Sequence, residues 1–174
     1  RQQVYDLDLQ AQTPAFLAPG RARHEVTERI TATGEVLKPL DEAQVVSVLE
    51  KLKQDNIEAV AVCLLFAFLN PAHEQRIETL AKSHAPGLAL SLSSSVDPAF
   101  REYERLVVTA FDAYTKPVLE RYLQQIVDGL ANIDIHVPLK IMQSRGGICA
   151  AQTARQHPVK LFLSGPAAGV LGGA

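Results

Sequence analysis

Two turns that combine serine with glycine are the parts of this sequence best suited to chemistry. The first is Gln143-Ser144-Arg145-Gly146-Gly147, and the second is Ser164-Gly165-Pro166-Ala167-Ala168-Gly169. Glycine has no Cβ, so backbone amides beside it can approach an anion closely. A helix that begins at the second turn would add roughly half a positive charge, and the Ser164 hydroxyl could donate to a phosphate oxygen. The two turns therefore indicate a phosphate or nucleotide site.

A structural role for the same glycines is an equally good interpretation. Gly165, Gly169, Gly172 and Gly173 would also let a helix pack closely on a sheet. Known nucleotide motifs do not decide between the two roles. The sequence contains neither the Gly-Lys-Ser/Thr of a P-loop nor a Gly-x-Gly-x-x-Gly fingerprint.

A dense cluster of charges, Arg101-Glu102-Tyr103-Glu104-Arg105, stands at the predicted start of a helix. The simpler interpretation is a solvated helix face with weak ion pairs, each contributing a few tenths of a kcal/mol, on the order of 0.3. The alternative is an anchor for a substrate or a neighbouring domain, formed by Arg101 and Arg105.

No metal site is predicted within this chain. His73-Glu74 would begin a zinc-protease motif, but Ile77 stands where the second histidine is required. The other histidines show no metal-ligand spacing, and no Gly-x-Ser-x-Gly sequence supports an α/β-hydrolase. Cys63 and Cys149 lie far apart and are predicted to be reduced thiols rather than a disulfide.

Composition places the chain among folded proteins without nucleic-acid or membrane partners. Its 174 residues are 47% hydrophobic and 21% charged, with a formal net charge of -2, so no basic excess exists to bind a phosphate backbone. The longest apolar run, residues 59–69, is too short to span a bilayer. No signal-peptide core follows the polar start, which predicts a cytoplasmic location. The absence of an initiator methionine and the Gly172-Gly173-Ala174 end predict an internal fragment of a longer polypeptide.

The first half of the chain has the pattern of an α/β unit. Residues 25–38 predict a hairpin with its turn at Thr33-Gly34, and Val4 to Leu9 predicts a short strand. Asp41 is a good helix N-cap with Gln44 as its capping-box partner, and Asn56 would stop that helix. The apolar run 59–66 is typical of a strand covered on both faces.

Another helix and strand complete this pattern. Asn70-Pro71 predicts a helix that ends at Pro86-Gly87, and residues 88–92 predict a second strand. Residues 40–93 are therefore an αβαβ run, which indicates α/β architecture with a right-handed crossover.

The second half is predicted to begin with a long helix. Asp97-Pro98 would start it, Lys116-Pro117 would kink or break it, and Asn132 would close it. A stripe at helical spacing predicts its buried face, formed by Phe100, Tyr103, Val107, Ala110, Phe111 and Tyr114. Strands over 139–142 and 159–163 would each lead into one of the two turns, with a short helix over 150–156 between them.

Taken in order, the motifs resemble those of the hydantoinase A/5-oxoprolinase family, near its N-methylhydantoinase (ATP-hydrolysing) subunits. The resemblance covers essentially the whole chain. Its first half is carried by Tyr5-Asp6-Leu7, Glu25-Val26, Glu28-Arg29-Ile30, Gly34-x-Val36-Leu37-x-Pro39-Leu40-Asp41 and Asn70-Pro71-x-His73-Glu74. Its second half is carried by Arg101-Glu102-Tyr103-Glu104-Arg105, Ala113-Tyr114, Ile141-Met142-Gln143-Ser144-x-Gly146-Gly147 and Leu163-Ser164-Gly165-Pro166-Ala167-Ala168-Gly169-Val170.

The resemblance implies an α/β fragment of an actin-like ATPase (ribonuclease H-like) fold, with a mixed sheet, flanking helices and one long helix. Residues 1–38 would end an N-terminal lobe, residues 39–96 would be its αβαβ segment, and residues 97–174 would hold the long helix and the start of the core domain. The parent protein would use ATP and Mg²⁺ to open a cyclic amide, such as a hydantoin or 5-oxoproline, with a B-type partner subunit or a fused B domain.

The family's Asp-x-Gly-Gly-Thr phosphate loops do not occur in this chain. The fragment is therefore expected to be inactive alone, to bind no nucleotide and to supply part of the cleft wall. Ser164, Gly165 and Gly169 would lie beside phosphate or nucleotide, and Ser144, Gly146 and Gly147 beside substrate or nucleotide. No catalytic base or nucleophile is predicted. The alternatives are a subunit similar to the acetone carboxylase β subunit and a non-catalytic ATPase-like binding module.

Overall fold

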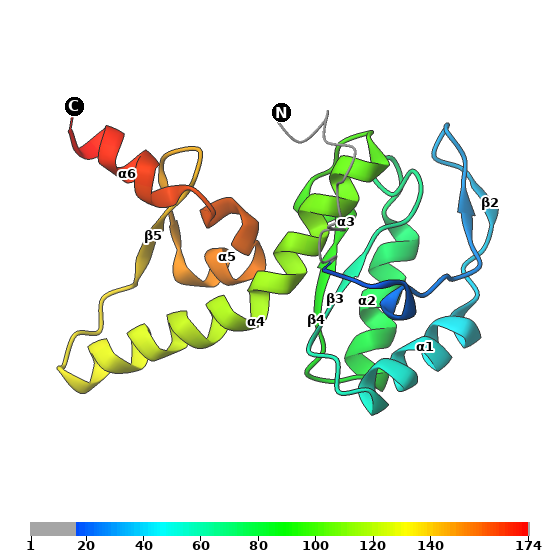
Figure 1. The fold of residues 1–174 in the computed structure, drawn as a ribbon, viewed down its shortest axis with the longest axis horizontal. Coiled ribbons are helices and arrows are strands. Elements are labelled where there is room, and N and C mark those ends of the chain that lie inside the picture. The colour runs from blue at the N-terminus through cyan, green and yellow to red at the C-terminus, as the bar shows by residue number, and fades with distance from the viewer. Residues whose placement is uncertain (1–16, 174) are drawn as a thin grey trace, which may run out of the picture.

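The computed structural model describes residues 17–173 of the chain. Figure 1 shows an N-terminal α/β unit and a smaller C-terminal unit, joined by the long helix α4 (Glu102–Asn132). The strand predicted over Val4 to Leu9 lies outside the described residues. No helix in the described range has the length and apolarity needed to cross a bilayer.

The predicted hairpin is confirmed. Strand β1 (Arg29–Ile30) pairs antiparallel with β2 (Val36–Lys38) after the short 3-10 helix η2 (Gly20–Ala22). Gly34 turns the chain at φ +83°, in the left-handed region that L side chains rarely adopt. A hydrogen bond joins this turn to the segment before α2, because Asn70 Nδ2 donates to the Gly34 carbonyl at 2.9 Å.

Helix α1 (Glu42–Gln54) begins at the predicted cap, since Asp41 Oδ1 accepts from the Gln44 amide at 3.0 Å. The predicted capping box is wrong. The Gln44 side chain accepts from the Thr27 amide at 2.7 Å and donates to the Glu25 carbonyl at 3.3 Å, so it fastens the preceding segment to the helix. Asn56 follows the helix in the left-handed conformation at φ +53°, as expected of a helix stop.

The predicted α/β core is confirmed. Strand β3 (Ala59–Val62) pairs parallel with β4 (Ala89–Leu92), and helix α2 (Ala72–His84) connects them. Figure 1 shows these strands between α4 on one side and α2 and α1 on the other. A buried apolar cluster of the core lies largely between α1 and α2 and consists of Val45, Leu49, Ile77, Leu80, Ala81 and Ala85.

Strand β3 is shorter than the predicted run 59–66. The chain turns after Val62, and the amides of Ala67 and Leu69 bond within the turn to the carbonyls of Leu64 and Phe66. Phe66 adopts a left-handed φ of +59°, which is unusual for a bulky residue. The second half of the apolar run is therefore a loop at the carboxyl end of the sheet.

The start of the long helix was predicted wrongly. Ser93–Val96 form a separate short helix α3, and α4 begins at Glu102 rather than Pro98. The intervening loop is held in place because the Ala99 amide donates to the Asp97 carbonyl at 2.7 Å while the Ala99 carbonyl accepts from Arg105 at 2.8 Å. Pro117 lies inside α4 without ending it, and the helix changes direction along its course in Figure 1.

The predicted buried face of α4 is also wrong. Tyr103 and Tyr114 are 73% and 65% exposed, whereas Arg105, Thr109 and Asp112 are fully buried. The polar face is buried because its groups have partners. Arg105 and Asp112 bond to the distant Leu64 carbonyl and Val159 amide, and the Thr109 hydroxyl donates to the Arg105 carbonyl at 2.6 Å.

The C-terminal unit begins with an antiparallel hairpin of β5 (Lys140–Met142) and β6 (Ile148–Ala150), and the sequence reasoning missed β6. The predicted short helix is confirmed as α5 (Ala151–Gln156). The strand predicted over 159–163 is wrong, because 3-10 helix η3 (Pro158–Leu161) stands there. Its backbone bonds to α4 and to the first turn rather than to a neighbouring strand. Helix α6 (Ser164–Gly172) follows.

Candidate functional site

The two predicted turns lie next to each other in the C-terminal unit. The Ser144 amide and hydroxyl both donate to the Lys160 carbonyl at 2.7 Å. The same hydroxyl oxygen accepts from the Leu163 amide at 3.1 Å, one residue before Ser164. Ser144 thus connects the β5–β6 turn to the segment that leads into α6, and the structure brings together loops that are 19 residues apart.

Glycine is required in the first turn by its backbone conformation. Gly146 and Gly147 have φ values of +82° and +77°. The turn closes with hydrogen bonds from the Gln143 amide to the Gly147 carbonyl at 3.0 Å and from the Gly146 amide to the Gln143 carbonyl at 3.1 Å. These two glycines therefore form a hairpin turn, whether or not a ligand binds there.

The glycines of α6 face open space in the part of the chain that the structure describes. A Cβ placed on Gly165, Gly169 or Gly172 would meet no heavy atom within 4 Å. Within the described residues, no sheet packs against these three glycines, and Gly173 would bring a Cβ to 3.2 Å from the Gly169 carbonyl of that helix. Open space in front of Gly165 and Gly169 is compatible with a ligand approaching the backbone.

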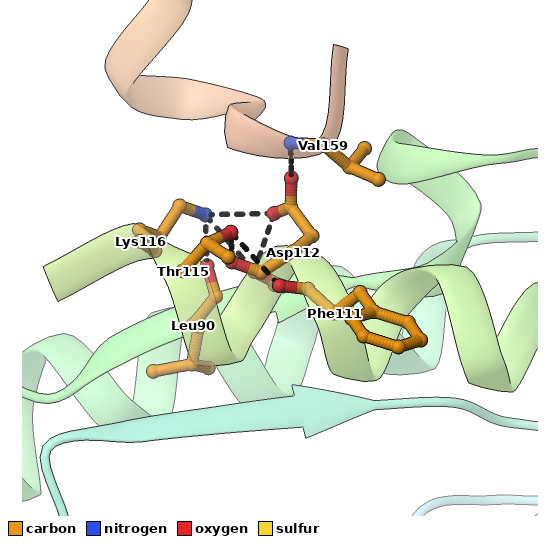
Figure 2. A network of polar contacts seen from close by, with 7 residues as sticks. Leu90, Phe111, Asp112, Thr115, Lys116 and Val159 are labelled. Carbon is orange, nitrogen blue, oxygen red and sulfur yellow. Dashed lines mark hydrogen bonds and ion pairs between the residues drawn. The ribbon is translucent and has the colours of Figure 1, made fainter. Parts of the chain in front are cut away.

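A buried carboxylate on α4 fastens this unit to the rest of the protein (Figure 2). Asp112 is fully buried, and its Oδ1 accepts from the Val159 amide at 3.0 Å. Its Oδ2 accepts from the Ser91 hydroxyl at 2.7 Å and lies 3.6 Å from Lys116 Nζ. Lys116 Nζ also donates to the Leu90 carbonyl at 2.6 Å. The network joins β4, α4 and η3.

Sequence reasoning did not select Asp112 or Lys116. The available signal was a charged pair at i and i+4 within an otherwise apolar stretch of helix. Such a pair is usually read as a solvated ion pair. Its burial depends on Ser91 and Val159, which lie 21 and 47 residues from Asp112 in sequence.

His157 lies at the edge of the same network. Its Nδ1 is buried and has no hydrogen-bond partner among residues 17–173. Burial lowers the pKa of the His157 imidazole below its ordinary value of 6.5, and the positive charges of Lys160 and Lys116 lower the pKa further, against an opposing effect of Asp112. His157 is therefore favoured in its neutral form.

A second buried polar cluster lies at the carboxyl ends of β3 and β4. Glu74 is fully buried, and its carboxylate accepts from the Leu64 amide at 3.0 Å and from the Ser93 hydroxyl at 2.7 Å. The Ser94 amide and hydroxyl add bonds of 2.9 and 2.7 Å. With four donors on one carboxylate, the cluster is satisfied within the protein.

The two candidate anchor arginines have different environments. Arg101 is exposed and pairs with Glu104 at 3.3 Å, as expected of a solvated face. Arg105 is fully buried and donates to Ser93 Oγ at 3.1 Å and to the Leu64 and Ala99 carbonyls at 2.8 Å each. Its guanidinium lies 5.3 Å from the centroid of the Phe68 ring. Arg105 is thus an anchor within the chain, between α4 and the loop after β3.

The remaining histidine motif is also structural. His73 Nδ1 lies 2.7 Å from Glu28 Oε2, and its neighbour Glu74 belongs to the buried cluster. Within residues 17–173, no three His, Cys, Asp or Glu side chains are grouped so that they could hold a metal ion. Cys63 and Cys149 are both free thiols and half-buried.

Two family models together match almost the whole chain. Residues 1–85 match the hydantoinase/oxoprolinase N-terminal region, and residues 105–174 match the hydantoinase/oxoprolinase family itself. The order of motifs in the sequence had indicated the same family.

Three characterised relatives are similar over most of the chain. Caprolactamase subunit alpha of Pseudomonas jessenii is 30% identical over 87% of this chain. The acetophenone carboxylase gamma subunit of Aromatoleum aromaticum is 31% identical over 86%, and 5-oxoprolinase of Saccharomyces cerevisiae is 35% identical over 79%. The matched part covers 22%, 21% and 10% of these proteins, so the chain spans a quarter of their length or less.

The fold is shared with solved structures. The crystal structure of ATP-dependent caprolactamase from Pseudomonas jessenii superposes with a TM-score of 0.83 at 30% identity, covering 92% of this chain and 23% of that one. Nucleotide-free acetone carboxylase superposes with a TM-score of 0.71 at 22% identity over 85% of this chain, which shows the fold alone. The predicted mixed α/β class is confirmed.

Proposed function

Because this chain belongs to the hydantoinase/oxoprolinase family, we propose that it works as part of an ATP-dependent hydrolase that opens a cyclic amide. The observation that carries the proposal is the similarity to ATP-dependent caprolactamase, at a TM-score of 0.83 over 92% of the chain. Caprolactam and 5-oxoproline, named by two relatives, are both cyclic amides. The substrate class would include these lactams and hydantoins such as N-methylhydantoin.

In this proposal the two adjoining turns line the reaction cleft. Ser164, Gly165 and Gly169 would lie beside the nucleotide phosphates, and Ser144, Gly146 and Gly147 beside the substrate or nucleotide. The open space next to Gly165 and Gly169 supports this placement, because a backbone without a side chain leaves room for a ligand. The predicted domain division after residues 38 and 96 belongs to the same proposal.

The described residues do not form a complete site for ATP and Mg²⁺. They contain no cluster of carboxylates suited to the cation, and the sequence has no Asp-x-Gly-Gly-Thr or P-loop motif. We therefore assign nucleotide phosphates and Mg²⁺ mainly to other parts of the complete enzyme. The 174 residues alone are proposed to be inactive and to form one wall of the cleft.

A partner subunit is part of the proposal. Two relatives are named as subunits, the alpha subunit of caprolactamase and the gamma subunit of acetophenone carboxylase. The proposed partner is a B-type subunit or a fused B domain. No surface of this chain is assigned to that contact.

One observation favours a second function, carboxylation of a ketone. The acetophenone carboxylase gamma subunit is as similar to this chain as the caprolactamase subunit is, at 31% against 30% identity. A third possibility, a non-catalytic ATPase-like binding module, requires that the complete protein releases no ADP with either class of substrate.

The deciding experiment uses the complete protein with its partner subunit. ADP release is followed with hydantoin, 5-oxoproline or caprolactam, and separately with acetone or acetophenone plus bicarbonate. We expect ADP release that depends on a cyclic amide and is matched by an equal amount of ring-opened product. Release that depends on ketone and bicarbonate would establish the carboxylase. Nucleotide binding without substrate-dependent ADP release would establish the binding module.

A further inference from the structure

We infer that Asp112 is a positioning residue that holds both glycine turns in place relative to the α/β unit. The inference rests on the proposed function, in which those turns line the cleft. Asp112 touches neither turn. It acts through the backbone of η3, where its Oδ1 accepts from the Val159 amide at 3.0 Å (Figure 2).

A short chain of hydrogen bonds leads from Asp112 to each turn. Val159 is followed by Lys160, whose carbonyl accepts both the amide and the hydroxyl hydrogen of Ser144 at 2.7 Å. The Ser144 oxygen then accepts from the Leu163 amide at 3.1 Å, directly before Ser164. One carboxylate therefore fixes the backbone segment on which both turns depend.

The other oxygen of Asp112 sets where that segment lies. Oδ2 accepts from the hydroxyl of Ser91 on β4 at 2.7 Å, and Lys116 Nζ lies 3.6 Å away. β4 belongs to the parallel sheet of the N-terminal unit, where it pairs with β3 in continuous register. Asp112 thus connects that sheet to η3 across α4. The sheet therefore determines where η3 and the two turns bonded to it lie.

A buried carboxylate is a costly way to join two units unless its donors are all in place. Asp112 is fully buried and has hydrogen bonds or an ion pair with groups from three elements, whereas the apolar ring contact of α4 with the C-terminal unit, between Phe111 and Phe162, is partly exposed at 39% and 62%. Directional bonds fix one arrangement of the units, which an apolar contact does less strictly. This favours positioning, and not only stability, as the role of Asp112.

Two substitutions separate these roles. Asp112→Asn keeps an oxygen that can accept from the Val159 amide but loses the negative charge beside Lys116. Asp112→Ala loses both. Thr115→Ala is the matched control, because Thr115 is on the same turn of α4 and its hydroxyl, within the described residues, donates to the carbonyls of Phe111 and Asp112 of that helix alone.

The test combines amide hydrogen exchange with steady-state kinetics on the complete protein and its partner. In Asp112→Ala we expect the Ser144 and Leu163 amides to exchange at least tenfold faster, with β3 and β4 unchanged. We also expect the KM for the cyclic amide or for ATP to rise at least tenfold, with a smaller change in kcat. Asp112→Asn should recover most of both effects, and Thr115→Ala should match the wild type.

The two readouts fail in different ways. Unchanged exchange at Ser144 and Leu163 in Asp112→Ala would overturn the inference. Faster exchange throughout the chain, with a lower kcat and an unchanged KM, would also overturn it, because that is the signature of lost stability alone. Faster exchange confined to the turns with unchanged kinetics would leave the positioning role standing and would contradict the proposed role of the turns in the cleft.

A second variant keeps the inference testable if Asp112→Ala does not fold. Ser144→Ala removes both bonds of the hydroxyl, to the Lys160 carbonyl and from the Leu163 amide, without leaving a buried charge unpaired. We expect faster exchange at Leu163 in this variant, and exchange is its only readout because Ser144 is itself proposed to lie beside the substrate or nucleotide. Exchange at Leu163 equal to that of the wild type would contradict the proposed connection between the turns.

Discussion

Glu74 and Ser93 share a 2.7 Å hydrogen bond between two fully buried side chains that lie 19 residues apart. Ser93 Oγ also accepts from Arg105 Nε at 3.1 Å, so a single hydroxyl lies between a buried carboxylate and a buried guanidinium. The three residues come from α2, α3 and α4, and they meet where β3 and β4 end. This cluster fixes the loop after β3 and the start of the long helix.

Removing Glu74 should strongly destabilise the protein. Glu74→Ala leaves the Ser93 hydroxyl, the Ser94 amide and the Leu64 amide without this acceptor, and removes the carboxylate that is linked to Arg105 through Ser93 Oγ. We expect a loss of about 3–5 kcal/mol in the free energy of unfolding, measured by urea denaturation. Glu78→Ala, on the exposed side of the same helix, should change it by less than about 1 kcal/mol. Equal losses in the two variants would contradict the buried cluster.

Substituting Arg105 by lysine should destabilise the protein. The guanidinium donates in three directions, to Ser93, Leu64 and Ala99, and an ammonium on a flexible chain cannot reproduce that geometry. We expect Arg105→Lys to cost about 1–3 kcal/mol because at least one buried carbonyl is left unpaired. The same change at the exposed Arg101 is the control and should have almost no effect. The measurement is thermal unfolding followed by circular dichroism, and similar melting temperatures for both variants would refute the prediction.

The glycines of the two turns should respond in opposite ways to alanine. Gly146→Ala forces an L residue to φ +82° and should cost about 1–2 kcal/mol. Gly169→Ala lies inside α6 with open space at the Cβ position, and should stabilise by about 0.5–1 kcal/mol. Urea denaturation of both variants checks the signs.

Activity of the complete protein gives the second readout for Gly169→Ala. If Gly169 lies beside the nucleotide, this variant should be more stable and yet have a higher KM for ATP. Full activity together with higher stability would remove Gly169 from the proposed phosphate site.

Stability should fall at mildly acidic pH partly because of His157. Burial lowers the pKa of this imidazole in the folded protein below its value of 6.5 in the unfolded chain. Between the two pKa values the unfolded protein therefore binds more protons than the folded protein. The contribution of neutral His157 to the free energy of unfolding is lost as the pH falls through this range. It is fully present above the unfolded pKa.

The variant His157→Gln isolates this contribution. The difference in unfolding free energy between about pH 7.5 and about pH 5.5 should be smaller in the variant than in the wild type. Chemical denaturation at the two pH values measures it. A variant whose pH dependence equals that of the wild type would show that His157 does not titrate between the folded and unfolded states in this range.

Local signals in the sequence predicted the elements whose determinants lie within a few residues. Asp41 caps α1 through the Gln44 amide, and Asn70 Oδ1 accepts from the Ala72 amide at the start of α2. Gly34 and Asn56 adopt the left-handed conformations that their residue types allow. The parallel β3–β4 pair followed from apolar runs alternating with helical periodicity, and the order of motifs identified the family.

The environment of α4 could not be predicted in this way. The apolar stripe of α4 predicted the wrong buried face, because the buried Arg105 and Asp112 bond to groups far away in sequence, among them Leu64 and Val159, at 41 and 47 residues. The strand expected over 159–163 failed for the same reason, since its backbone bonds to Asp112 and Ser144 instead of to a strand. Periodicity reports which side chains are apolar, whereas burial of a polar side chain depends on donors and acceptors that only the folded chain brings within about 3 Å.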